Sequence, residues 1–163
     1  MEIHIRPARP NDHEALTRIS FASKRHWNDP ESYYRVWKEE LTITSRYILE
    51  NRVYVAETEG KPVGYFSIVE VKKDFHAGKV LVRKGCWLEH LFLLPAYIGK
   101  GIGTKLMHFA ETYCRREGIP SLYIFSDPHA NGFYDKMGAA YLRESPSSIE
   151  GRTVSVYEYR IAR

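Results

Sequence analysis

The sequence predicts a mixed α/β fold, a β-sheet flanked by helices, built as one domain over residues 1–163. Short segments rich in β-branched and aromatic residues alternate with segments whose apolar residues recur at helical spacing. Strands precede helices along the chain, so at least some strands pair in parallel. A hydrophobic fraction of 44% and a charged fraction of 27% are those of an ordinary globular protein, which excludes a disordered chain.

The N-terminal third predicts one strand followed by two helices. Residues 2–7 alternate isoleucine with polar side chains, as a half-buried strand does. A helix should follow, with Asn11 as its N-cap, Glu14 three residues later, and apolar side chains at helical spacing behind them. A second helix is expected over residues 30–50, because proline is favoured in a first helical turn and stands at position 30.

The middle of the chain predicts three strands and a helix. Residues 53–57 and 62–72 are rich in strand-forming residues and are separated by a Glu-Gly-Lys turn, which indicates a hairpin. A longer strand is expected over residues 80–94. A helix over residues 101–117 should follow and end at Gly118.

The C-terminal part predicts three more strands around a short helix. Proline suits the first turn of a helix, so Pro128 indicates a start there. The expected elements are a strand at 121–126, a helix at 128–137 capped by Asp127, and closing strands at 140–143 and 153–161. The predicted order is therefore β-α-α-β-β-β-α-β-α-β-β.

Composition excludes several classes of protein. No run approaches the roughly 18 apolar residues of a membrane helix, and charged residues near the N-terminus argue against a signal peptide. The two cysteines, Cys86 and Cys114, are expected to be reduced thiols in a cytoplasmic protein, and no Cys/His spacing predicts a metal site. The net charge of +4 favours an anionic ligand, whereas scattered lysines and arginines argue against nucleic acid as a partner.

The most informative stretch ends in a turn with three alternating glycines, Gly99, Gly101 and Gly103, before a helix begins. Glycine lets the backbone approach a ligand closely. The first helical N–H groups have no intrahelical acceptor and, with the helix dipole, form an anion site that suits a diphosphate. Lys100 and Lys105 add positive charge.

Two nucleotide motifs do not fit this turn. A P-loop needs a Gly-Lys-Ser/Thr end that is absent, and the dinucleotide fingerprint needs glycine at the position of Thr104. A tight strand-to-helix turn that binds nothing stays open on the residues alone.

Residues 95–104 resemble the acyl-CoA signature of the GNAT acetyltransferase superfamily, Gln or Arg, two residues, Gly, one residue, and Gly or Ala. Gly101 and Gly103 match it, and Ile98 stands at the Gln/Arg position. Residues 127–138 are similar to the family's later motif, with Asp127 in place of its asparagine. The two motifs occur in the family's order with a strand between them.

This resemblance implies a GNAT-like fold and acetyl-CoA as cosubstrate. In the family, a strand beside the thioester stabilises the oxyanion through a backbone N–H, and the glycine turn binds the pyrophosphate. The residues that the resemblance assigns to the coenzyme are Leu91, Phe92, Leu93, Gly99, Lys100, Gly101, Ile102, Gly103, Thr104 and Asp127.

Two side chains are the candidate catalytic groups. Tyr134 matches the family tyrosine near the sulfur and would donate a proton to the leaving thiolate; a packed aromatic ring is the alternative. Glu89 resembles a glutamate of polyamine-acetylating members and would help to deprotonate or anchor the amine, the alternative being an exposed strand carboxylate. His90 should point to the opposite face of its strand.

The resemblance leaves the amine acceptor open. The segment 26–29 and the aromatic side chains of Tyr33, Tyr34 and Trp37 would shape its pocket, although a stripe of this kind is more often core packing. The function expected is N-acetylation of a small-molecule or peptide amine by direct attack on the thioester. A catalytically silent acyl-CoA-binding module and an RNA-directed acetyltransferase are the alternatives, and a homodimer is compatible with the family.

Overall fold

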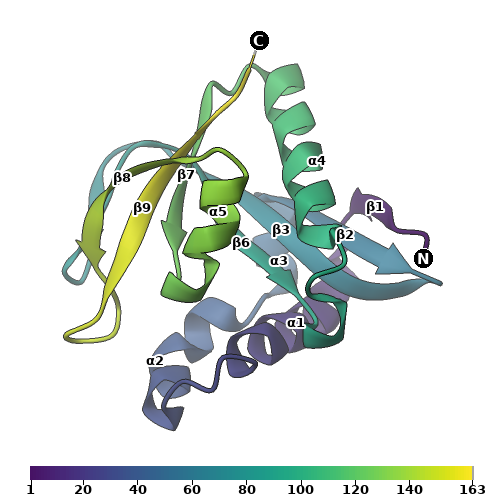
Figure 1. Ribbon diagram of the computed structural model, residues 1–163, viewed down its shortest axis with the longest axis horizontal. Helices are drawn as coiled ribbons and strands as arrows, with labels where there is room; N and C mark the ends of the chain where they lie inside the picture. Colours follow the sequence, from purple (N-terminus) through teal and green to yellow (C-terminus); the bar gives the residue numbers. More distant parts are fainter. Residues whose placement is uncertain (163) are drawn as a thin grey trace. The chain divides into compact units, whose positions relative to one another are not determined.

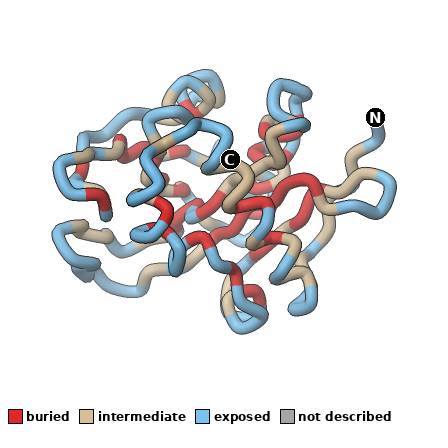
Figure 2. The backbone as a smooth tube through the Cα atoms, turned by 90° about the horizontal axis from the view of Figure 1, so that it is seen from below, coloured by how far each residue is buried: buried red, intermediate tan, exposed pale blue. Residues whose placement is uncertain are grey.

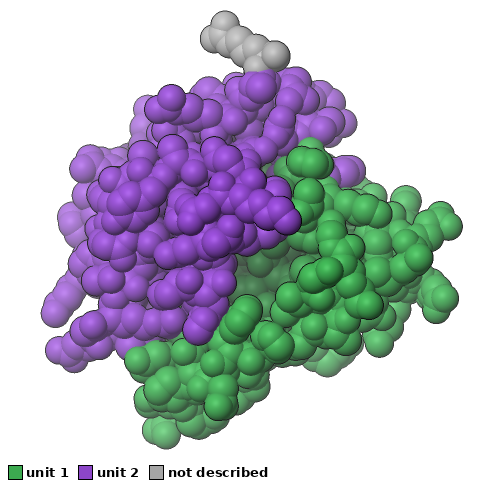
Figure 3. Space-filling model, in the orientation of Figure 1, with its two compact units in different colours: residues 1–68, 90–108 green, residues 69–89, 109–163 purple. Residues whose placement is uncertain are grey.

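The computed structural model describes residues 1–162, and Figure 1 shows its strands and helices, with three helices after the first strand and five strands after those helices. They form two compact units, coloured in Figure 3, namely residues 1–68 with 90–108 and residues 69–89 with those from 109 onward. Strands β3 (Lys61–Val71) and β6 (Gly85–Leu93) and helix α4 (Ile102–Glu117) contribute residues to both units. The organisation as one domain stays a prediction.

The first unit contains antiparallel strands whose two faces are both covered. Strand β1 (His4–Pro7) pairs with β2 (Arg52–Thr58), β2 pairs with β3, and β6 follows β3 in the sheet order. Pairing of Val55 with Tyr65 sets the register, and one face then packs on helices α1 (His13–Arg25) and α3 (Ser45–Glu50). Figure 2 shows the buried residues in red. The core of this face is formed by Leu16, Ile19, Ile43, Ile48, Val53, Val55 and Tyr65.

The predicted helix over residues 30–50 is wrong in its continuity. The chain forms α2 (Glu31–Leu41) and α3, separated by an extended segment at 42–44. The interruption follows from two contacts. Thr17 Oγ1 accepts from the Ile43 N–H at 2.9 Å and donates to its carbonyl, which holds Ile43 in the core, and Thr44 Oγ1 caps α3 by accepting from Tyr47 N. Tertiary burial of one β-branched residue thus outweighs helix propensity here.

The second unit is built on a mixed sheet. Strand β7 (Ser121–Ser126) pairs in parallel with β6 at Tyr123 and Trp87, and antiparallel with β9 (Thr153–Arg160). Strand β8 (Ala140–Pro146) pairs with β9 and is longer than predicted. The predicted helix at 128–137 is a 3₁₀ turn, η3 (Pro128–Ala130), followed by α5 (Asn131–Lys136). Parallel and antiparallel pairs together confirm the mixed α/β class.

The strand predicted over residues 80–94 is wrong at its beginning. A separate hairpin of β4 (Phe75–Ala77) and β5 (Val80–Val82) precedes β6. Its base is fixed because Asp74 Oδ1 accepts from the Lys84 N–H at 2.7 Å and Trp87 Nε1 donates to the Arg83 carbonyl at 2.7 Å. Segment 72–84 is strongly basic, with four lysines and one arginine against one aspartate.

Most other boundaries agree with the predicted ones. Helix α1 begins at His13, after a 3₁₀ turn (Pro10–Asp12), so its N-cap is Asp12 and the assignment of Asn11 is wrong. Helix α4 ends as predicted: Gly118 takes a positive φ of 71°, and Ile119 N–H reaches back to the Cys114 carbonyl at 2.9 Å. Across residues 1–162, no helix has both the length and the apolar character needed to span a bilayer.

Candidate active site

The glycine turn lies in the first unit, between β6 and α4. After a 3₁₀ turn, η2 (Pro95–Tyr97), the backbone takes positive φ angles at Gly99 (79°) and Gly101 (81°). A Cβ atom at either glycine would meet no neighbouring atom within 4 Å, so the space beside the turn is open. Only glycine adopts these angles without strain. The turn therefore exposes backbone that other residues would distort.

Helix α4 begins directly after this turn and presents its first N–H groups there. Lys105 N–H closes the first helical hydrogen bond on the Gly101 carbonyl at 3.1 Å. The N–H groups of residues 102–104 therefore precede the first helical hydrogen bond, and they can donate to an anion. Ile102 is fully buried and anchors the helix start, whereas Lys100 and Lys105 are exposed. Ile98, at the family's Gln/Arg position, is exposed as well.

The strand that precedes the turn is packed closely against β3. A Cβ atom at Gly64 would lie 2.5 Å from Leu93 Cδ2 and 3.0 Å from the Phe92 carbonyl oxygen, so only glycine fits there. The N–H of Leu94 donates to the Val63 carbonyl at 2.8 Å and is already engaged. The Leu94 N–H is therefore not available to donate to a ligand.

The face of β6 opposite to the Glu89 side chain carries a buried, uncharged histidine. His90 is 4% exposed while its neighbour Glu89 is exposed, so the predicted alternation of the two is confirmed. The imidazole stacks on Phe92 with ring centroids 5.3 Å apart and lies near Tyr47 and Tyr65. Burial first, and then the positive charge of Lys24, lower the pKa of His90 to about 3. The ring is therefore neutral at physiological pH.

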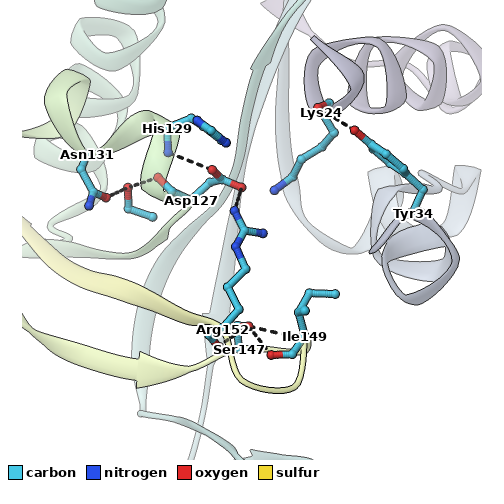
Figure 4. A network of polar contacts seen from close by, with 9 residues as sticks. Lys24, Tyr34, Asp127, His129, Asn131, Ser147, Ile149 and Arg152 are labelled. Atoms are coloured by element: carbon cyan, nitrogen blue, oxygen red, sulfur yellow. Dashed lines mark hydrogen bonds and ion pairs between the residues drawn. The ribbon is translucent and has the colours of Figure 1, made fainter. Parts of the chain in front are cut away.

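The second unit places Asp127 at the end of β7, at the start of the family's later motif. Its Oδ1 accepts from the His129 N–H at 2.9 Å, and its Oδ2 lies 3.5 Å from an Arg152 guanidinium nitrogen, as Figure 4 shows. Both side chains of this pair are largely buried, 17% and 16% exposed. Asp127 is thus both a helix cap, as the sequence predicts, and half of an ion pair.

A chain of hydrogen bonds runs from this point into the sheet. Ser126 Oγ donates to Asn131 Oδ1 at 2.7 Å, and Asn131 Nδ2 donates to Ser155 Oγ at 3.1 Å. Ser155 in turn donates to Glu144 at 2.7 Å. The chain fixes the first turn of α5, on which Tyr134 stands.

Tyr134 is buried on α5, 6% exposed. Its ring meets Phe133 edge-on, with centroids 5.2 Å apart, and lies at 6.0 Å from the ring of Tyr157. Tyr157 is itself fixed because its hydroxyl donates to Asp135 at 2.8 Å. Burial raises the pKa of the Tyr134 phenol well above its usual value, so the hydroxyl keeps its proton at neutral pH. A protonated phenol is the form that a general acid needs.

The predicted site residues therefore fall into groups within each unit. The first unit brings together residues 91–93 and the turn 99–104. The second unit brings Asp127 and Tyr134 onto the consecutive elements η3 and α5, and it carries Glu89 as an exposed carboxylate of β6.

The aromatic residues predicted near the acceptor serve partly as core. Tyr34 and Trp37 on α2 are each 5% exposed and pack edge-to-face with centroids 5.6 Å apart. The alternative of core packing therefore holds for these two rings. Trp27, in the connection between α1 and α2, is 41% exposed, and Asn28 beside it has a positive φ of 57°.

A cavity of about 530 Å³ also lies in the first unit, but its charge does not suit the coenzyme. Glu2, Glu57 and Glu59 line it, with Tyr97 at its edge. Carboxylates at these positions would repel phosphate groups. No cluster of histidine, cysteine and carboxylate side chains that could hold a metal occurs within residues 1–162.

Sequence analysis did not identify two residues that shape the candidate site, Arg152 and Gly64. Arg152 lies 25 residues beyond its partner Asp127, and no local pattern links them. Gly64 carried a usable signal, since an isolated glycine inside a strand often marks a close approach of backbone or side chain.

Comparison with known proteins identifies the family of the chain. Residues 14–139 match the model of the Acetyltransferase (GNAT) family. An uncharacterized N-acetyltransferase of Archaeoglobus fulgidus is 30% identical over 134 residues, 75% of this chain and 82% of its own. An uncharacterized acetyltransferase of Streptococcus pyogenes serotype M1 is 38% identical over 63 residues, 39% of this chain, and the match spans only 43% of that relative's length.

Solved structures share the fold at low sequence identity. A GCN5-related N-acetyltransferase from Rhodopseudomonas palustris has a TM-score of 0.76 and 20% identity, covering 98% of this chain and 96% of its own. The PaiA N-acetyltransferase from Thermoplasma acidophilum, solved with coenzyme A, has a TM-score of 0.74 and 19% identity, covering 98% and 99%. Since the family model covers most of the chain, the protein belongs to the GNAT acetyltransferase family.

Proposed function

We propose that this protein transfers the acetyl group of acetyl-CoA to a primary amine of a small molecule or peptide, by direct attack of the amine on the thioester. The observation that carries the proposal is the turn at residues 99–104, with two glycines at positive φ, open space beside them and a 16-residue helix starting there. Structures of the same fold were solved with coenzyme A and with acetyl-CoA, which supports this cosubstrate.

In this proposal the first unit binds and polarises the thioester. Backbone N–H groups at the start of α4 hold the pyrophosphate, with charge added by Lys100 and Lys105. A backbone N–H within Leu91–Leu93 donates to the carbonyl oxygen as it gains negative charge. Because the donors are backbone groups held in a β-strand, they need little reorganisation during the reaction.

The second unit supplies the proton transfers in this proposal. The amine nitrogen forms a bond to the carbonyl carbon, the C–S bond breaks, and the thiolate takes the phenolic proton of Tyr134. Glu89, exposed on β6, removes the amine's surplus proton directly or through water. Solvent then reprotonates the tyrosine.

The experiment that tests the proposal has two parts. Release of free thiol from acetyl-CoA is followed with a broad panel of amines, and acetyl-CoA affinity is measured by calorimetry for Gly101→Val and for the control Gly78→Val. Both glycines have positive φ, 81° and 62°, and open surroundings, so both substitutions cause similar backbone strain. Only Gly101→Val should weaken binding, by about 10²-fold or more, because the side chain occupies the pyrophosphate's space and distorts its donors. Equal affinities in the two variants would contradict the assignment of the turn.

A further inference from the structure

The hairpin of β4 and β5 has one face on which every side chain is apolar. Its register pairs Phe75 with Val82 and Ala77 with Val80, and side chains alternate along a strand, so these four lie on the same face. Phe75 is 47% exposed, Ala77 is exposed as well, and the two valines are half-buried. An antiparallel pair usually turns polar residues toward water, so an apolar face in contact with solvent indicates a surface that a partner covers.

The same hairpin carries positive charge that is not balanced within it. Lysines stand before β4, in the turn between the two strands and after β5, and all four are exposed: Lys72, Lys73, Lys79 and Lys84. Asp74 is the single acidic residue of segment 72–84, and its carboxylate already forms an ion pair with Arg83 at 3.4 Å. The excess of four positive charges in this segment therefore resides on lysines that flank the apolar face.

We propose that the β4–β5 hairpin binds the surface of a lipid bilayer that contains anionic phospholipids. Phe75 inserts at the level of the headgroups, and the four lysines contact the headgroup phosphates. The contact is peripheral, because only the hairpin enters the interface. It is a second property of the chain, separate from the proposed acetyl transfer, since no residue of segment 72–84 belongs to the candidate active site.

This combination of residues fits a lipid surface better than a protein or a nucleic acid. Protein interfaces are enriched in arginine and depleted in lysine, and the one arginine of the hairpin is engaged by Asp74. Nucleic acids are bound through phosphate contacts and stacking on aromatic rings, which leaves Val80 and Val82 without a role. At a membrane both parts are used, because apolar side chains enter the acyl boundary while ammonium groups stay among anionic headgroups.

The test of the charged part is flotation of the full chain with vesicles. One set contains phosphatidylcholine alone, and the other contains phosphatidylcholine mixed with phosphatidylglycerol. Wild type is compared with the double variant Lys72→Gln/Lys73→Gln. The control is Lys38→Gln/Lys61→Gln, which removes two exposed lysines, one from α2 and one from the start of β3. Both double variants remove the same charge, so they differ only in where it lay.

The apolar part is tested with a variant that leaves the charge unchanged. Phe75→Ser removes the exposed ring of β4, and the control Leu49→Ser removes an apolar side chain of α3 that is more exposed still. Phe75→Ser should weaken binding to the anionic vesicles about 10-fold, the effect of burying part of an aromatic ring, and Leu49→Ser should not weaken it. Equal binding by wild type and Phe75→Ser would overturn the insertion of this face.

Each lysine near an anionic surface strengthens binding about fivefold. Wild type should therefore bind only the vesicles with phosphatidylglycerol, and Lys72→Gln/Lys73→Gln should bind them about 10- to 30-fold more weakly, with little change in the control. Salt at about 0.5 M should remove this difference. Absence of wild-type binding at about 0.05 M salt would overturn the proposal. Binding to single-stranded RNA or to polyglutamate as tight as to the vesicles would overturn it as well, in favour of another polyanion.

Discussion

The two compact units carry different kinds of candidate site residues. In the first unit the features that suit coenzyme A are backbone features, namely two glycines at positive φ, the first N–H groups of α4 and a strand held against Gly64. In the second unit they are side chains, Asp127 with Arg152 and the buried phenol of Tyr134. The first unit would thus recognise its ligand through backbone shape and the dipole of helix α4. The second unit would act through ionisable side chains.

The difference explains which departures from the family pattern the protein tolerates. An exposed isoleucine at position 98 replaces a polar residue without removing any backbone donor. Aspartate at position 127 introduces a charge instead, and the structure compensates with a guanidinium 3.5 Å away. Where backbone N–H groups are the donors, a changed side chain needs no compensating substitution. Where a side chain introduces a buried charge, a residue of opposite charge must lie beside it.

The largest effect should come from the second unit. Tyr134→Phe should lower turnover by about 10²-fold, the lower end for a general acid because the thiol is a good leaving group, with acetyl-CoA affinity nearly unchanged. Steady-state kinetics and calorimetry measure the two quantities. Tyr141→Phe is the control, because it removes the hydroxyl of an exposed tyrosine of β8 that donates to Glu144 of the same strand. Full activity of the Tyr134 variant would make this ring a packing residue and leave water as the proton source.

The first unit should respond to pH through stability. The pKa of His90 is about 3 in the folded protein against an ordinary value of 6.5, so only the unfolded chain gains a proton as pH falls below 6.5. The contribution of His90 to the free energy of unfolding is therefore fully present above pH 6.5. It decreases on acidification by up to about 1.4 kcal/mol per pH unit.

Denaturant unfolding between pH 6.5 and 4.5 measures this loss. The window lies above the range in which Asp12 contributes, whose pKa is lowered from 3.8 chiefly by its hydrogen bond with Arg6. His90→Phe should flatten the dependence, while His76→Phe on the exposed strand β4 should not. A slope shared equally by both variants would assign the pH dependence to other groups.

A smaller effect is expected at the exposed carboxylate of the second unit. Glu89→Gln should lower activity about 10-fold at pH values well below the amine's pKa, where deprotonation limits the reaction, and less as the pH approaches that pKa. Coenzyme affinity should be unaffected. The pH–rate profile is compared with that of Glu70→Gln, an exposed carboxylate of β3. Identical profiles would leave Glu89 an ordinary surface residue.

The smallest effect concerns the ion pair of the second unit. Arg152→Met should destabilise the protein by about 1 kcal/mol, because the largely buried carboxylate of Asp127 loses the attraction of a guanidinium 3.5 Å away. Adding Asp127→Asn, the family's residue, should recover most of the loss. Urea unfolding of the two single variants and the double variant measures the coupling. If the changes in unfolding free energy of the two single variants add up to that of the double variant, the two residues have no coupling energy.

Elements with strong local signals were predictable. The β2–β3 hairpin and helix α4 follow from turn glycines and apolar spacing, and the end of α4 follows from Gly118. The break at 42–44 depends instead on a distant contact, that of Thr17 with Ile43, and on the burial of Ile43. The break at 83–84 is fixed by side-chain hydrogen bonds of Asp74 and Trp87 with the exposed backbone there, which residue propensities do not show.

The same distinction holds for the candidate site. The turn 99–104 could be read from glycine spacing because its chemistry lies in consecutive backbone groups. The partners of Asp127 and Asn131 could not, since Arg152 and Ser155 lie 25 and 24 residues away along the chain. Likewise, only the folded chain shows that Lys24 lies over Trp37.

The basic hairpin of β4 and β5 has a consequence for the protein's behaviour in solution. Segment 72–84 carries four lysines and one arginine against one aspartate, a formal charge equal to the +4 of the whole chain, so all other residues together sum to zero. Proteins near zero net charge associate and precipitate more readily. The net charge that keeps the protein in solution at neutral pH thus equals the charge of segment 72–84. A variant in which this hairpin is shortened to an uncharged turn should precipitate at a lower protein concentration.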